Sequence, residues 1–161
     1  MKKLIIIGLL AFSAKSFAQT AVENGTIYKE HPYITAVKEE VADFAKGDTV
    51  GAASFYADSV KFYDSPEPTK PYGIKQARAS WQKIFTDWGM PTIKQVGYPD
   101  GLQYTSDPFT VQSWWEITVV NIKTQKTAKF EQVVFDTFNK DGKITVELSY
   151  YDTSAIKDAM K

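Results

Sequence analysis

The chain has 161 residues, 19 of them basic and 19 acidic, with no cysteine and an aromatic share of 14%. This length suits one domain with one hydrophobic core. The absence of cysteine excludes disulfides, thiol catalysis and cysteine-ligated metals, and the lack of a basic excess argues against nucleic acid as a partner.

The first 18 residues are typical of a secretory signal peptide. The chain starts Met-Lys-Lys, continues with the apolar run 4–12, and places Ser16 and Ala18 at the −3 and −1 positions of a cleavage site. The apolar run is shorter than the roughly 20 residues that span a membrane. We therefore expect cleavage after Ala18, a periplasmic or secreted protein, no membrane contact afterwards, and a remaining net charge near −3, from 16 basic and 19 acidic residues.

Three helices are predicted in the first half of the chain. Apolar residues recur at helical spacing before Gly47, after Asp48 and again before Gly89. Gly47 is a typical helix end, and Asp48 can cap the helix that follows. The predicted helices are Pro32–Lys46, Thr49–Ala57 and Gly73–Asp87.

Strands are predicted for most of the remainder. The short strand Val60–Tyr63 precedes a proline-containing loop, and Asp141-Gly142 is typical of a tight hairpin. Helices followed by long antiparallel strands predict one α+β domain over 28–161, after a lead over 19–27. The long strands are Thr92–Tyr98, Phe109–Ile122, Lys126–Asn139 and Lys143–Tyr151.

Two segments carry a resemblance to a known superfamily. In 42–64, a helix end, a second helix and a short strand lead to Asp64-Ser65-Pro66, and in 135–152 two strands are joined by a tight turn. This order resembles the nuclear transport factor 2-like superfamily, which includes ketosteroid isomerase and the SnoaL-like polyketide cyclases. The resemblance implies a cone-shaped, curved antiparallel sheet wrapped around three N-terminal helices, with one central pocket in which the function is carried out.

Asp64 is the first candidate for a catalytic residue. The base of ketosteroid isomerase follows a similar run of helix and strand, so the resemblance implies that Asp64 is a base. A carboxylate in a pocket wall has a raised pKa because it is desolvated, and it can then move protons near neutral pH. The alternative is that Asp64 only accepts hydrogen bonds from the loop that follows it.

The oxyanion-binding pair of the isomerase is not matched. That enzyme uses a tyrosine on the first helix and a protonated aspartate on a late strand. The corresponding positions here hold Glu40 and Val134. Neither side chain donates a hydrogen bond unless Glu40 is protonated, so steroid isomerisation is not expected.

Further polar residues point toward the pocket if the isomerase register holds. Alternation along the last two strands brings Gln132, Asp136, Glu147 and Tyr151 to one face. Asp136 and Glu147 are therefore candidate catalytic residues beside Asp64. Burying them together is costly unless they bind each other or a polar ligand, and the alternatives are a cross-strand pair without catalytic duty or positions at the rim.

Aromatic residues are the main candidates for contact with a ligand. Trp81 and Trp88 lie on the apolar stripe of the third predicted helix. The adjacent Trp114 and Trp115 must point to opposite faces of their strand, and the outer one would form an apolar patch of the kind that becomes a homodimer interface. The candidate ligand-binding residues are Tyr56, Tyr63, Trp81, Trp88, Trp115, Gln132, Val134 and Tyr151.

The expected function is the binding of a small apolar or aromatic molecule, with acid–base chemistry of isomerase, cyclase or lyase type at Asp64. Two alternatives remain open: a non-catalytic carrier or sensor using the same pocket, and a dimeric interaction module using the outer sheet face. We expect no cofactor. The single histidine, His31, precedes a helix as a solvated flank, and a transition-metal site would need three or four ligands.

Overall fold

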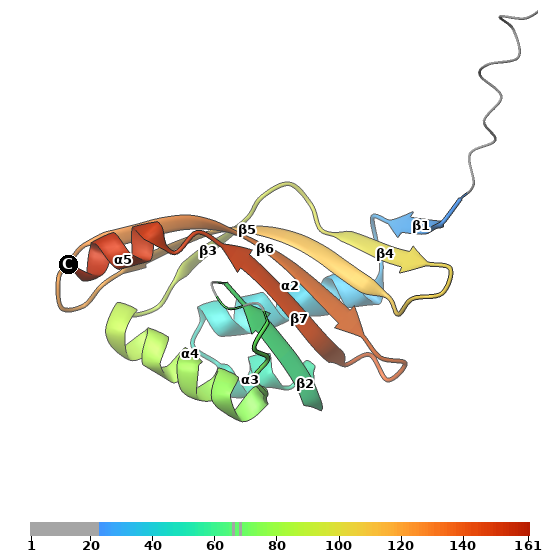
Figure 1. Cartoon of the computed structure of the whole chain (residues 1–161), viewed down its shortest axis with the longest axis horizontal. Coiled ribbons are helices and arrows are strands. Elements are labelled where there is room, and N and C mark those ends of the chain that lie inside the picture. Colours follow the sequence, from blue (N-terminus) through green and yellow to red (C-terminus); the bar gives the residue numbers. More distant parts are fainter. Residues whose placement is uncertain (1–22, 66, 68) are drawn as a thin grey trace, which may run out of the picture.

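The computed structural model describes residues 23–65, 67 and 69–161, which form four helices and a seven-stranded sheet (Figure 1). The expected signal peptide with its cleavage after Ala18 lies outside the described residues. The helices are α2 (Pro32–Ala45), α3 (Thr49–Ala53), α4 (Ile74–Trp88) and α5 (Ser154–Met160). The strands are β1 (Gly25–Tyr28), β2 (Tyr56–Asp64), β3 (Thr92–Gln95), β4 (Asp100–Tyr104), β5 (Thr110–Val120), β6 (Thr127–Phe138) and β7 (Ile144–Tyr151).

The expected α+β class is confirmed. The strands are ordered β1-β4-β5-β6-β7-β2, and β3 pairs with β5 outside this path. The sheet curves over α2, α3 and α4 without closing into a barrel (Figure 1). One pair departs from the antiparallel expectation, because β2 runs parallel to β7. The long strands β5, β6 and β7 therefore form the concave wall that faces the helices.

Three short elements were not predicted. The strand β1 is exposed at all four positions, so it lacks the apolar alternation that identifies a half-buried strand. It pairs with β4, which brings 25–27 of the expected lead into the sheet. The strand β4 begins inside a Pro-Asp-Gly sequence that is typical of a turn, and α5 has only seven residues.

The second helix is shorter than predicted, and the strand after it is longer. Helix α3 ends at Ala53, and β2 already begins at Tyr56 rather than Val60. Tyr56 pairs with Ile144 of β7, and the register shifts by a bulge before Lys61. Pairing with a distant strand thus makes Tyr56 and Ala57 part of a strand, although local propensity predicted a helix there.

The hydrophobic core lies between α2, α4 and the concave face of the sheet. Ile34 and Val37 of α2 are buried against Val60 and Phe62 of β2 and against the sheet. A second, smaller cluster forms where α5 covers the end of the sheet with Ala159. Among the described residues, no helix combines the length and the apolar character needed to cross a membrane.

The β6–β7 hairpin sets the register of two candidate residues. Gly142 has a φ of 74°, as the predicted Asp-Gly turn requires. The Asn139 Oδ1 accepts hydrogen bonds from the backbone N–H groups of Asp141 at 3.0 Å and Lys143 at 2.9 Å. With this turn in place, Asp136 lies directly opposite Glu147.

Candidate functional site

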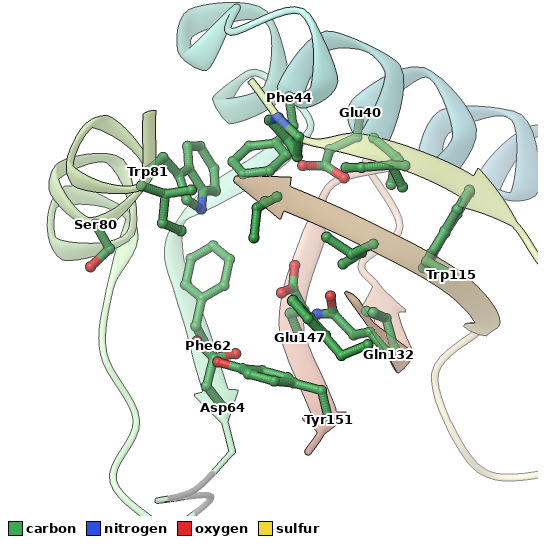
Figure 2. Close-up of a pocket in the computed structure, with 18 of the residues that line it drawn as sticks. Glu40, Phe44, Phe62, Asp64, Ser80, Trp81, Trp115, Gln132, Glu147 and Tyr151 are labelled. Carbon is green, nitrogen blue, oxygen red and sulfur yellow. The ribbon is translucent and has the colours of Figure 1, made fainter. Parts of the chain in front are cut away.

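A cavity of about 320 Å³ lies between the concave face of the sheet and helices α2 and α4 (Figure 2). Its volume is at the lower end of the range of about 300–1,000 Å³ that is typical of small-molecule sites. Most of its wall is aromatic or aliphatic. Helix α4 supplies Trp81 and Trp88, β5 supplies Trp115, and α5 closes one end with Ile156.

An aromatic wall covers one side of the cavity. The Trp81 ring centroid lies 5.8 Å from that of Phe44, 6.1 Å from that of Tyr56 and 6.3 Å from that of Phe62. These four residues come from α2, β2 and α4, so tertiary packing assembles the wall. We call Phe44, Tyr56, Phe62 and Trp81 the aromatic wall.

Asp64 lies at one end of the cavity between two phenols. Alternation along β2 brings both Phe62 and Asp64 to the pocket. The Tyr72 hydroxyl donates a hydrogen bond to Asp64 Oδ2, and Tyr151 lies beside Asp64 in Figure 2. Burial raises the pKa of Asp64, while the hydrogen bond from Tyr72 acts in the opposite direction. Burial and the charge of Asp64 raise the pKa of Tyr151 to about 12.

Three further carboxyl groups enter the cavity from three different elements. Glu40 follows Ile34 and Val37 on the buried face of α2, and Asp136 and Glu147 are register partners on β6 and β7. Register partners of an antiparallel pair share one face and lie side by side. We call Glu40, Asp136 and Glu147 the acidic cluster. Figure 2 shows Glu147 pointing into the cavity, with Glu40 entering from the helical side.

Burial keeps the acidic cluster protonated to a higher pH than usual. Desolvation, and then the charges of the neighbouring carboxyls, raise the pKa values of Glu40 and Asp136 well above their ordinary values. Desolvation also raises the pKa of Glu147 to about 7, although a 2.6 Å hydrogen bond from the Tyr56 hydroxyl favours its charged form. The cluster can therefore supply or take up protons near neutral pH.

The structure brings ten of the eleven candidate site residues to this one cavity. They are Asp64, Glu147, Asp136, Tyr56, Trp81, Trp88, Trp115, Gln132, Val134 and Tyr151. Tyr63 is not among the described residues that line the cavity. It stands between Phe62 and Asp64 on β2, and alternation turns its side chain to the opposite face of the sheet.

Several lining residues were not chosen from the sequence. Tyr72 lies outside the predicted elements, and it reaches the cavity because its backbone bridges to Phe62, with N···O distances of 2.9 and 3.1 Å. Glu40 was considered only as a replacement for a tyrosine. Its burial could have been expected, because it continues the three-residue spacing of Ile34 and Val37.

The lone histidine lies outside the cavity. His31 is the N-cap of α2, where its Nδ1 accepts a hydrogen bond from the Tyr33 backbone N–H at 3.2 Å. Its ring stacks on Phe109, with the ring centroids 4.1 Å apart. These contacts give His31 a structural role at the start of the helix.

A family model described as a SnoaL-like domain matches residues 37–147. The chain belongs to the SnoaL-like family. The match spans the segment from the middle of α2 to Glu147, and so it includes the acidic cluster and Asp64. A search of curated proteins gave no match.

Solved structures with the same fold are numerous and distant in sequence. An NTF2-like protein from Burkholderia pseudomallei K96243 superposes with a TM-score of 0.67 at 14% identity, over 82% of this chain and 99% of the other. TerC, co-crystallised with polyporic acid, has a TM-score of 0.64 at 20% identity, over 81% and 98%. A protein with a ketosteroid isomerase-like fold from Catenulispora acidiphila DSM 44928, in complex with trimethylamine, has a TM-score of 0.61 at 10% identity, over 75% and 88%. At these identities the likeness establishes the fold of the SnoaL-like domain.

Proposed function

We propose that this SnoaL-like domain binds a small, largely apolar or aromatic molecule in its cavity and transfers a proton on it, with Asp64 as the base. The observation that carries the proposal is the position of Asp64. It is a half-buried carboxylate at the wall of an apolar cavity, beside the hydroxyl of Tyr72 and close to Tyr151. A base in such a place is shielded from water and has a raised pKa.

The remaining carboxyl groups extend the same chemistry. A base alone leaves a carbanion or an oxyanion on the substrate, and a nearby acid can return the proton or stabilise the charge. Glu147 and Asp136, whose pKa values are raised by burial, are suited to act as that acid. Isomerisation, cyclisation and lyase-type elimination all consist of such steps. The complexes of TerC and of the Catenulispora protein support small-molecule binding in this fold.

A panel of small aromatic acids, ketones, sterols and amines tests the pocket itself. A ligand present at a hundred times its dissociation constant should stabilise the folded state by about 2.7 kcal/mol, seen as a saturable rise in the melting temperature of residues 19–161. The Trp81→Ala variant should lose that rise because it removes a quarter of the aromatic wall. Ser59→Ala, an exposed change on β2, is the control. No shift across the panel would contradict the proposal.

A carrier or sensor without catalysis is the second candidate. The Tyr72 hydroxyl already donates a hydrogen bond to one carboxylate oxygen of Asp64. A carboxylate with a purely structural role would make the same hydrogen bond. In that case ligands bind the cavity, and replacement of Asp64 changes no reaction.

The expected export also remains a proposal, based on the pattern of residues 1–18. Sequencing of the N-terminus from the exported protein should find Gln19 first, and an intact Met1 would contradict it.

The outer sheet face suggests how two copies of the domain would associate. Trp114, Val133 and Tyr150 are successive register partners across β5, β6 and β7, on the face turned away from Trp115 and the cavity. Tyr150 is 45% exposed and packs edge-on against Phe135. This row of apolar side chains supports the proposed homodimer. Sedimentation should detect a dimer that Tyr150→Glu disrupts, and a wild-type monomer at high concentration would contradict it.

A further inference from the structure

We propose that the molecule bound in the cavity carries a positively charged ammonium group, which the acidic cluster holds while the apolar body of the ligand contacts the aromatic wall. The inference rests on the proposed function only in using the same cavity. It adds the charge and the orientation of the ligand. The reaction at Asp64 is a separate question.

Asp136 gives the first reason. Its side chain is 3% exposed and lines the cavity. Its Oδ1 is buried and has no hydrogen-bond partner among the described residues. A buried carboxylate oxygen without a partner is costly, and such atoms are rare in folded proteins. The unpartnered oxygen of Asp136 therefore indicates a place where a ligand supplies the missing donor.

The balance of charge in the cavity gives the second reason. Four carboxyl groups line it: the three of the acidic cluster and that of Asp64. No Lys, Arg or His is among the described residues that line it. Carboxyl groups that are buried together either hold protons or, when ionised, repel each other unless a cation lies between them. A positively charged ligand would provide the counter-charge that the chain itself does not.

The surroundings favour an organic cation over a metal ion. The described residues contain no group of three or more His, Asp or Glu side chains placed so that they could hold a metal ion. The acidic cluster instead adjoins the aromatic wall, since Tyr56 belongs to the wall and donates its hydroxyl hydrogen bond to Glu147. Aromatic faces attract ammonium groups, most strongly where water is excluded. An amine with an apolar or aromatic body satisfies both surfaces.

Binding of a cation should be coupled to the release of protons from the acidic cluster. Burial raises the pKa values of the acidic cluster, so part of it is protonated near pH 6. A cation favours the charged carboxylates, so its binding should release protons and strengthen as the pH rises toward 7. The other titratable groups that face the cluster are Asp43 on α2, Tyr56 and Asp64 on β2, Tyr72 before α4, and Tyr151 on β7.

Two probes of one shape separate charge from shape. Benzylammonium and ethylbenzene differ by a positively charged nitrogen in place of a neutral carbon. The ammonium group has N–H donors for the unpartnered oxygen of Asp136, and it stays charged at pH 6 because amine pKa values lie well above that pH. We expect tryptophan fluorescence titration at pH 6 to show at least tenfold tighter binding of the cation. A pH indicator in weakly buffered solution should report protons released by the cation and none released by the neutral probe.

Two variants locate the effect. Asp136→Asn should weaken binding of the cation at least tenfold and leave the neutral probe unchanged. Glu131→Gln, an exposed change on the same strand, should alter neither. Should Asp136→Asn fail to fold, Glu147→Gln tests the same cluster. Equal binding of both probes would overturn the inference while supporting the apolar cavity, and binding of neither would count against the cavity as well.

Discussion

Asp64→Asn is expected to slow proton transfer on a bound substrate by about 10²–10⁴-fold, the range found for removal of a general base. The amide has nearly the shape of the carboxylate and can still accept the hydrogen bond from Tyr72, so the cavity should keep its form. Binding of the ligand should change little. The measurement is the exchange of an acidic C–H of the ligand into D₂O, followed by proton NMR with wild type and variant.

The matched control for Asp64 lies on the same strand. Asp58→Asn changes an exposed carboxylate of β2 and should leave exchange at the wild-type rate. Because burial raises the pKa of Asp64, the wild-type rate should fall at acidic pH as this carboxylate takes up a proton. A wild-type exchange rate in Asp64→Asn would remove Asp64 from the mechanism and leave the carrier as the better reading.

Glu147→Gln is expected to stabilise the folded domain above pH 7. The pKa of Glu147 is about 7 in the folded protein against an ordinary value of 4.5. A carboxyl with a raised pKa contributes stability that is full below about pH 4.5 and is lost as the pH rises to about 7. The loss is on the order of 3 kcal/mol. Glutamine carries no charge at any pH and can accept the hydrogen bond from Tyr56, so the variant avoids this loss.

Urea denaturation at intervals from pH 4 to pH 8 measures this effect. Wild type should lose stability between about pH 4.5 and pH 7. Glu147→Gln should lose less, because only the contributions of Glu40 and Asp136, whose pKa values are also raised by burial, remain. Near pH 4 the two proteins should be similar. Glu131→Gln is the control, since its side chain is exposed on β6 and should leave the wild-type profile unchanged. If the stability of wild type did not change between pH 4 and pH 8, the carboxyl groups of the acidic cluster would have their ordinary pKa values, and the prediction would be wrong.

The parts of the fold that were predictable are those with strong local signals. Helices α2 and α4 end within one residue of their predicted C-termini, because Gly47 and Gly89 follow their apolar stripes and both have positive φ. The inward face of β6, with Gln132 and Asp136, follows from alternation once the family register is assumed. These signals depend only on neighbours in sequence.

The remaining features depend on contacts between distant segments. The strand β2 begins at Tyr56, which pairs with Ile144 of β7, although the predicted helix extended to Ala57. Tyr72 enters the site through its backbone bridge to Phe62. The position of Tyr63 outside the cavity also depends on contacts between distant segments. The tyrosine was chosen for its chemistry, whereas the face on which it lies is decided by the register of the whole strand.

The parallel pairing of β2 with β7 affects how the chain folds during synthesis. Asp64 lies opposite Ser149, 85 residues later in the chain, and the Ser65 backbone N–H donates to the Ser149 carbonyl at 3.0 Å. Contacts between residues so distant in sequence form slowly during folding. A growing chain contains Asp64 and the aromatic wall long before it contains the strand that holds β2 in place. The wall of the cavity is therefore complete only when synthesis has passed β7, and a ligand that binds the cavity would report complete folding.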